Sequence, residues 1–255
     1  MLFKRLFPLF ALVLSWSLAS SSPTHRQVVA AVQPILDHAA AEFNMSFSFG
    51  YADGVHPYKT IVGLGVGLDE RCLDRSDAKC EQTMLTAHSI IPAGSVTKAY
   101  TGVAILQEVE RGRLDLDAAA HTWIDPPLQR QNKTTLLELW GGNKEVMKIT
   151  TRDLLGMTSG LNDYDDGQLL VWTLLNGGAD LDPFAMLAVT NKTLTCSTVP
   201  CPPYYSSINY VLLGLMLQEL HSVAAWEDYD QLSIIHPTRR KVYNETVFPK
   251  LGRCR

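Results

Sequence analysis

A serine and a lysine three residues apart form the part of this sequence best suited to chemistry. Ser95 and Lys98 follow Gly94 and open a segment whose apolar spacing predicts a helix as far as Arg111. Because side chains three apart on a helix are neighbours, the Lys98 nitrogen can reach the Ser95 hydroxyl and accept its proton. The positive end of the helix favours negative charge at that serine. The pair predicts a nucleophile that forms a covalent acyl intermediate.

The Ser-x-x-Lys pattern occurs a second time, at Ser76 and Lys79, in a polar segment between two cysteines. That copy lacks the apolar periodicity that would hold its side chains in one geometry. After Ser95, by contrast, apolar residues at helical spacing predict a helix with one apolar stripe, made of Val96, Ala99, Tyr100, Val103 and Leu106. We assign a function to the Ser95 copy alone, although an N-capping serine beside a solvated lysine is the ordinary interpretation of such a pair by itself.

The sequence around Ser95 resembles a known family of enzymes. Residues 90–117 read IIPAGSVTKAYTGVAILQEVERGRLDLD, which is similar to the nucleophile segment of the class C β-lactamase and D-alanyl-D-alanine carboxypeptidase family. The likeness continues over Ile149–Leu161, where ITTRDLLGMTSGL resembles the family's next helix and its Thr-Ser-Gly-Leu turn. We expect this turn to shape the site without taking part in the chemistry.

A third likeness covers Tyr204–Gly214, where the family carries Tyr-x-Asn just before a helix similar to YVLLG. The distance to that helix selects Tyr205 over Tyr204. The resemblance implies that Tyr205 moves protons to and from Ser95, although a structural tyrosine at a helix start is the alternative. The chain departs from the pattern at Ser207, where Asn is usual. A serine can still donate a hydrogen bond, but it lacks the reach of the amide.

The family's remaining motif, a Lys-Thr-Gly or His-x-Gly strand beside the nucleophile, has no counterpart in the sequence. His236-Pro237-Thr238 is not a match, because proline lacks the N–H that such a strand presents to substrate. The likeness fades over Trp226–Gln231, whereas the family domain normally continues with further strands. Two interpretations stay open: a truncated product of a longer hydrolase, which we favour, and a genuine short form that has lost catalysis.

The resemblance implies an α+β fold of the β-lactamase and penicillin-binding-protein kind. Such a fold combines a helical subdomain with an antiparallel sheet flanked by helices, and we expect the sheet to be incomplete at the C-terminal end. We place the hydrolase domain at residues 26–231 and a divergent tail at 232–255. The residue patterns predict strands over 45–51 and 60–68, and helices over 26–43, 151–155, 167–175, 183–189 and 210–221.

The N-terminus has the form of a secretory signal peptide. Lys4 and Arg5 precede an apolar stretch over residues 6–18, which is shorter than the roughly 20 residues of a membrane-spanning helix. We assign residues 1–19 to this signal and expect a secreted, extracellular protein with no membrane contact after cleavage. The chain also carries four glycosylation sequons, at Asn44, Asn132, Asn191 and Asn244.

Cysteine usage and charge fit the same compartment. Cys72 and Cys80 bracket one loop and Cys196 and Cys201 another, which suggests two local disulfides and leaves Cys254 over. No cysteines or histidines have the spacing of a zinc site. The net charge of −4 gives no reason to expect a nucleic-acid partner.

Taken with the resemblance, these features predict a serine hydrolase that acts on an amide or ester of a small molecule or peptide. Ser95 is the expected nucleophile, Lys98 the base, Tyr205 its partner in proton transfer and Ser207 a positioning group. An esterase, a carboxypeptidase and a transesterase all fit, and no metal or organic cofactor is implied. The alternative is a catalytically inactive secreted protein that binds or scaffolds. The sequence does not indicate an oligomeric state.

Overall fold

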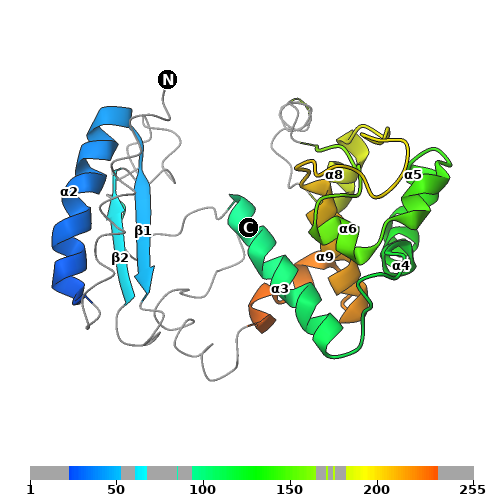
Figure 1. Ribbon diagram of the computed structural model, residues 1–255, viewed down its shortest axis with the longest axis horizontal. Coiled ribbons are helices and arrows are strands. Elements are labelled where there is room, and N and C mark those ends of the chain that lie inside the picture. The colour runs from blue at the N-terminus through cyan, green and yellow to red at the C-terminus, as the bar shows by residue number, and fades with distance from the viewer. Residues whose placement is uncertain are drawn as a thin grey trace. The chain divides into compact units, whose positions relative to one another are not determined.

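The computed structural model describes residues 23–52, 61–67, 85, 94–164, 171, 175 and 182–234. The chain divides into two compact units, one before and one after the boundary between residues 92 and 93. Figure 1 draws both units. The predicted signal peptide, the Ser76/Lys79 copy and the segment containing His236 all lie outside the described residues.

In the described part of the first unit, one helix packs against a two-stranded antiparallel sheet (Figure 1). Helix α2 (His25–Phe43) starts at a capping box, in which the Thr24 side chain and the Gln27 side chain each accept a backbone N–H of the other residue. Strands β1 (Phe47–Ala52) and β2 (Ile61–Val66) pair in a continuous register, and α2 packs against β2. The predicted helix and both strands are therefore confirmed to within two residues at each end.

Strand β1 shows the predicted alternation. Phe47, Phe49 and Tyr51 are half-buried, while the residues between them are exposed. Side chains on a strand point alternately to its two faces, so the aromatic side chains share one face. That face and the buried Val28 and Val62 give this unit a small apolar core.

The second unit is helical and is built around one apolar helix. Helix α9 (Ile208–Leu220) buries residues on nearly every side, which is why the chain packs helices on several of its faces. Helices α3 (Thr97–Glu110), α4 (His121–Asn132), α6 (Thr151–Leu155) and α8 (Pro183–Val189) all pack against it (Figure 1). The short helix α5 (Leu136–Leu139) contacts α4. The described residues also form 3-10 turns at Gly94–Val96, Lys144–Lys148, Trp226–Asp228 and Gln231–Ile234.

Local capping signals account for the helices whose ends match the prediction. Helix α6 begins after Thr150, whose side chain accepts the Asp153 N–H while the Asp153 carboxylate accepts the Thr150 N–H. Helix α8 begins with Pro183 at its first position, after the capping residue Asp182. Helix α9 starts two residues earlier than predicted. Of the helix predicted over 167–175, only residues 171 and 175 are described, and both are helical.

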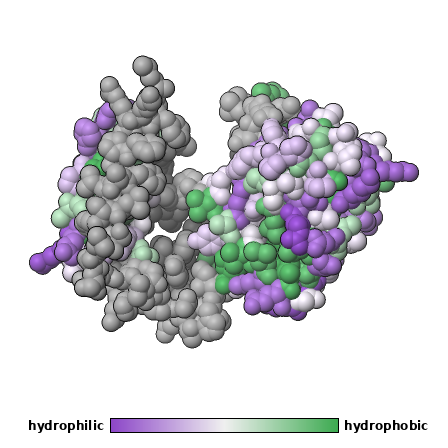
Figure 2. All heavy atoms as spheres, viewed as in Figure 1, coloured by the Kyte–Doolittle hydropathy of each residue, from purple (hydrophilic) through white to green (hydrophobic). Residues whose placement is uncertain are grey.

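The helix predicted after Ser95 is present as α3, but its apolar stripe is not its buried face. Val96, Val103 and Leu106 are 63%, 44% and 50% exposed, and apolar side chains gather at the surface around α3 in Figure 2. The face that packs inward carries Thr101, Ala104, Ile105 and Glu108. Apolar residues recur at three- and four-residue steps on both faces of this helix, so periodicity alone did not decide which face the rest of the unit covers.

Polar side chains on the buried face of α3 are tolerated because they have partners. The Thr101 hydroxyl donates to the Thr97 carbonyl at 3.4 Å. The Glu108 carboxylate, 1% exposed, forms ion pairs with Arg111 and Arg113, each at 2.5 Å. Burial of a charge is costly unless it is paired, and these two guanidinium groups supply the pairing.

One predicted disulfide is confirmed. Cys196 and Cys201 are joined, with their Cα atoms 5.7 Å apart. Cys72, Cys80 and Cys254 lie outside the described residues. Among the helices that the structure describes, none has the length and apolar character needed to cross a membrane.

Candidate active site

Ser95 lies in the 3-10 turn directly before α3 and is exposed to solvent. The turn begins at Gly94, whose φ of +51° belongs to the left-handed region that favours glycine. The Thr97 hydroxyl donates to the Gly94 carbonyl at 2.8 Å and fixes the turn against the helix. Lys98, in the first turn of α3, donates from Nζ to Ser95 Oγ at 3.0 Å. The local sequence thus aims the amine at the hydroxyl.

Tyr205 brings a third functional group to the same point from 110 residues further along the chain. Its Oη lies 2.7 Å from Ser95 Oγ, within hydrogen-bonding distance, and either oxygen can be the donor. Lys98 Nζ lies 5.0 Å from the centre of the Tyr205 ring. We refer to Ser95, Lys98 and Tyr205 as the serine cluster. Ser95 Oγ, Lys98 Nζ and Tyr205 Oη are close enough for a proton to move among them.

The surroundings of Tyr205 favour its ionised form. Hydrogen bonds from Lys98, then from Ser95 and Ser207, lower the pKa of Tyr205, and the positive charge of Lys98 adds to this; slight burial opposes them. When Lys98 donates to Ser95 Oγ, the serine's own hydrogen is left to point at Tyr205 Oη. The lowered pKa of Tyr205 favours the phenolate, and a phenolate at the receiving end of that bond can take the serine proton.

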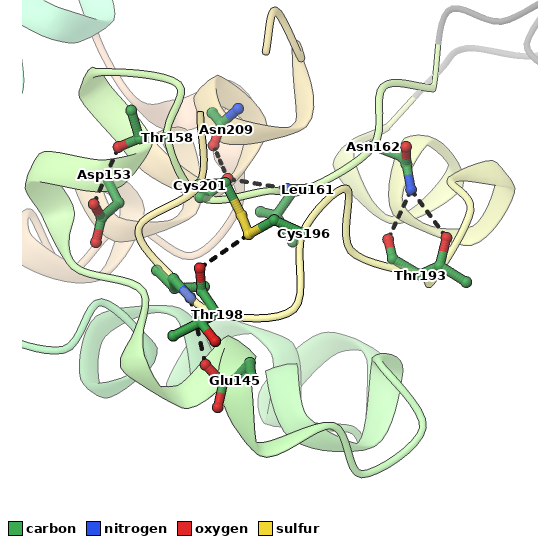
Figure 3. The surroundings of a disulfide bond; sticks show 12 residues. Glu145, Asp153, Thr158, Leu161, Asn162, Thr193, Cys196, Thr198, Cys201 and Asn209 are labelled. Atoms are coloured by element: carbon green, nitrogen blue, oxygen red, sulfur yellow. Dashed lines mark hydrogen bonds between the residues drawn. A yellow bond between two sulfur atoms is a disulfide. The ribbon is translucent and has the colours of Figure 1, made fainter. Parts of the chain in front are cut away.

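The Thr-Ser-Gly-Leu turn lies beside the Cys196–Cys201 disulfide (Figure 3). It also holds the loop that carries Tyr205. The Tyr204 N–H donates to the Met157 carbonyl at 3.0 Å, and the Cys201 N–H donates to the Thr158 carbonyl at 2.7 Å. Gly160 has a φ of +75°, and a Cβ there would collide with Cys201 Sγ. This close approach requires glycine. The turn therefore positions the loop that carries Tyr205. This contact is consistent with the expectation that the turn shapes the site.

Ser207 stands at the entrance to α9 and is buried, with 7% exposure. Its backbone N–H donates to Asp163 Oδ1 at 3.0 Å. Its side chain contributes one of the hydrogen bonds that lower the pKa of Tyr205. Ser207 thus lies next to the serine cluster and acts on it through the tyrosine.

Two polar side chains that support this region were missed by the sequence reasoning. Asn209 is 1% exposed on α9; its Nδ2 donates to the Ser206 carbonyl at 3.0 Å, and its Oδ1 accepts from Ser159 Oγ at 2.5 Å. Asp163 accepts the Ser207 N–H described above. The available signal was an asparagine at the start of the most apolar helix of the chain, because a buried amide needs dedicated partners.

The structure thus brings all four sequence-predicted site residues together. The distances establish their proximity, and the catalytic role of each remains a prediction. Within the described part of the chain, no group of three or more histidine, cysteine, aspartate or glutamate side chains could hold a metal ion.

The chain belongs to the β-lactamase family. The family model named Beta-lactamase matches residues 55–244, which is more than half of the sequence. The predicted β-lactamase and penicillin-binding-protein fold is confirmed, as a helix-rich α+β structure whose described sheet has two antiparallel strands.

Solved structures with the same fold include two amide-cleaving enzymes. A D-stereospecific amidohydrolase from Streptomyces sp. is 22% identical, with a TM-score of 0.55 over 80% of this chain and 51% of its own. A D-amino acid amidase from Ochrobactrum anthropi SV3 is 16% identical, with a TM-score of 0.54 over 82% of this chain and 50% of its own.

An octameric penicillin-binding protein homologue from Pyrococcus abyssi is also similar, with 20% identity and a TM-score of 0.53. That match covers 85% of this chain and 42% of the homologue. The chain therefore spans about half the length of the solved structures it matches.

Proposed function

We propose that this protein is a serine hydrolase that cleaves an amide or an ester through an acyl-enzyme formed on Ser95. The observation that carries the proposal is the serine cluster itself. An exposed hydroxyl accepts a hydrogen bond from Lys98 Nζ at 3.0 Å and lies 2.7 Å from an ionisation-prone phenol. Membership of the β-lactamase family and the amide-cleaving structural neighbours support the same class of reaction.

The proposed reaction has two halves. Ser95 Oγ attacks the substrate's carbonyl carbon while its proton passes to the Lys98 and Tyr205 pair, where the Oη of ionised Tyr205 receives it and becomes a neutral phenol. The C–N or C–O bond then breaks, and the leaving amine or alcohol takes that proton away. Water attacks the acyl-Ser95 ester next, its proton returns through the same pair to Ser95 Oγ, and the acid product departs. The start of α3 favours the negative charge on the carbonyl oxygen.

Ser207 has a positioning role in this proposal. Its side chain hydrogen-bonds to Tyr205, so its effect on the nucleophile is exerted through that tyrosine. Because two of the structural neighbours are a D-stereospecific amidohydrolase and a D-amino acid amidase, small amides, including amides of D-amino acids, are the first substrates to test.

Covalent labelling tests the proposal. A fluorophosphonate probe and a penicillin probe should each form an adduct that mass spectrometry locates on Ser95, and Ser95→Ala should remove it. Ser76→Ala is the matched control, because it removes the serine of the other Ser-x-x-Lys pattern and should leave labelling intact. No adduct on folded wild-type protein would contradict the proposal and favour the alternative, a non-catalytic binding or scaffolding protein.

We also propose that the chain passes through the secretory pathway. The Cys196–Cys201 disulfide supports an oxidising compartment. Asn44, Asn132 and Asn191 are all exposed, and the Thr193 hydroxyl donates to Asn191 Oδ1 at 3.0 Å within that sequon. Protein secreted by a eukaryotic host should lose mass on treatment with peptide N-glycosidase. An unglycosylated cytoplasmic product from the intact coding sequence would contradict this.

A further inference from the structure

A cavity of about 450 Å³ in the second unit adjoins the serine cluster and plays no part in the steps above. The described residues of its walls come mainly from α3, α8, α9 and the 3-10 turns that follow α9. Lys98 and Ser207 both line it, so it is continuous with the candidate active site. Its volume falls within the range of pockets that bind small molecules.

The two main walls of the cavity are helices that run side by side in the same direction. Near their N-terminal ends, Ser95 meets Tyr205; near their C-terminal ends, His221 Nε2 lies 3.3 Å from Glu108 Oε1. Helix α3 lines the cavity near its start. Helix α9 lines it along one face, with residues at three- and four-residue spacing: Ser207, Tyr210, Val211, Gly214 and Leu217. This face extends about 15 Å away from the serine cluster, at the rise of an α-helix.

Away from Lys98 and Ser207 the lining is mostly apolar or aromatic. It includes Met186, Tyr210, Val211, Leu217, Trp226 and Tyr229. Among the lining residues that the structure describes, the one carboxylate belongs to Glu227, which is exposed and can stay in water. An elongated space of this character stabilises an apolar chain by removing it from water.

Gly214 leaves part of this space open. A Cβ added at this position would meet no atom within 4 Å, although the neighbouring residues Leu213 and Leu215 are fully buried. Glycine in the middle of a helix weakens it, so its presence in α9 has a cost in stability. The missing side chain widens the cavity where a longer ligand would pass.

We propose that this cavity holds the apolar acyl group of the substrate, that this group is longer than acetyl, and that Gly214 sets the length the cavity admits. The inference rests on the proposed function, because the carbonyl carbon is placed at Ser95 Oγ. From there the acyl chain extends past Lys98 and Thr101 along α9. Each methylene buried in the cavity should raise kcat/KM about fourfold, the equivalent of ~0.8 kcal/mol.

Turnover of p-nitrophenyl octanoate and p-nitrophenyl acetate tests the proposal. The ratio of kcat/KM for octanoate to that for acetate should fall at least tenfold in Gly214→Leu, with the acetate value little changed. Gly214→Ala should lower the ratio by a smaller factor. Because alanine favours helix more than glycine does, that decrease cannot come from a weaker α9.

Gly102→Ala is the matched control, since it also adds a methyl group to a helical glycine. The nearest atoms to that methyl are in Leu155 and Tyr210, at 3.8 and 3.9 Å, and Gly102 does not line the cavity. Its octanoate-to-acetate ratio should equal that of the wild type. An unchanged ratio in Gly214→Leu would overturn the proposal, as would a wild-type preference for acetate.

Binding to Ser95→Ala separates this proposal from the proposed function. Calorimetric titration should show that sodium octanoate binds to Ser95→Ala. It should bind at least tenfold more weakly to the double variant Ser95→Ala, Gly214→Leu, and sodium acetate should not bind to either protein. Octanoate binding of this kind without any ester turnover by the wild type would overturn the hydrolase and keep the cavity. Ester turnover without Gly214-dependent octanoate binding would overturn the cavity and keep the hydrolase.

Discussion

The two ends of helix α3 carry two clusters of polar groups that differ in burial and pairing. The serine cluster at the N-terminal end is exposed, with Tyr205 53% exposed, and its groups hydrogen-bond mainly to one another. At the C-terminal end, Glu108, Arg111, Arg113 and His221 form what we call the glutamate cluster, around a carboxylate that is 1% exposed.

This difference in burial and pairing separates groups suited to catalysis from groups suited to stabilising the fold. Groups that hand a proton to a substrate must be reachable and must tolerate more than one protonation state, and both hold at the serine cluster. The glutamate cluster instead pairs a buried carboxylate with two guanidinium groups, and it ties the ends of α3 and α9 together. We therefore expect substitutions in the serine cluster to affect acylation, and substitutions in the glutamate cluster to affect stability.

The largest effect is expected for Lys98→Ala. Loss of the amine that donates to Ser95 Oγ should slow acylation by about 10²- to 10⁴-fold. The melting temperature should stay close to that of the wild type, because alanine is favourable in a helix. The rate of fluorophosphonate labelling and a thermal unfolding curve measure the two quantities. Lys79→Ala, in the other Ser-x-x-Lys pattern, should change neither, and a normal labelling rate in Lys98→Ala would exclude the lysine from the mechanism.

Tyr205→Phe should reduce acylation by about 10²-fold and change its pH dependence. In the wild type, the rate should rise with pH as Tyr205 ionises, with a midpoint below 10 because its pKa is lowered in the folded protein. Tyr205→Phe should lack this rise.

The same lowered pKa fixes the sign of any effect on stability. A lowered pKa stabilises the fold above the unfolded value, near 10, and this contribution is lost as the pH falls through the folded value. Near neutral pH, Tyr205→Phe should therefore unfold at about the same urea concentration as the wild type. A pH profile of labelling that is identical in both proteins would contradict the assigned role.

Glu108→Gln should lower stability and leave acylation unchanged, whereas Lys98→Ala and Tyr205→Phe should slow acylation and leave stability nearly unchanged. It leaves Arg111 and Arg113 without a charged partner at a buried site, and the free energy of unfolding should fall by about 2 kcal/mol. This figure is modest because both arginine side chains are about half exposed and can turn towards water. Urea unfolding measures the change. Labelling per folded molecule should match the wild type, and a large specific loss there would link the two ends of α3.

The smallest effect is expected for Ser207→Asn, which restores the residue usual in the family at this position. Turnover should be preserved or improve by a few fold, because the amide can still donate towards Tyr205. The site is buried, so circular dichroism should accompany the kinetics to report the folded fraction. Reduced activity in fully folded protein would show that the serine is matched to its surroundings here.

Some of this molecule could be predicted from the sequence because the interactions concerned are local. Ser95 and Lys98 are three residues apart, and the helix between them brings the amine to the hydroxyl. The capping residues Thr150 and Asp182 marked the starts of α6 and α8 within one residue. The five-residue separation of Cys196 and Cys201 left their pairing to a single loop.

Only the tertiary structure decided which distant groups meet. Tyr205 was selected by resemblance, but its 2.7 Å approach to Ser95 depends on the packing of α9 against α3 and on the bond from Tyr204 to Met157. The apolar stripe predicted on α3 did not identify its buried face, because both faces carry apolar residues and the choice between them depends on which neighbours cover them. Periodicity records that a helix has an apolar side, whereas packing of the whole unit determines which side loses its contact with water.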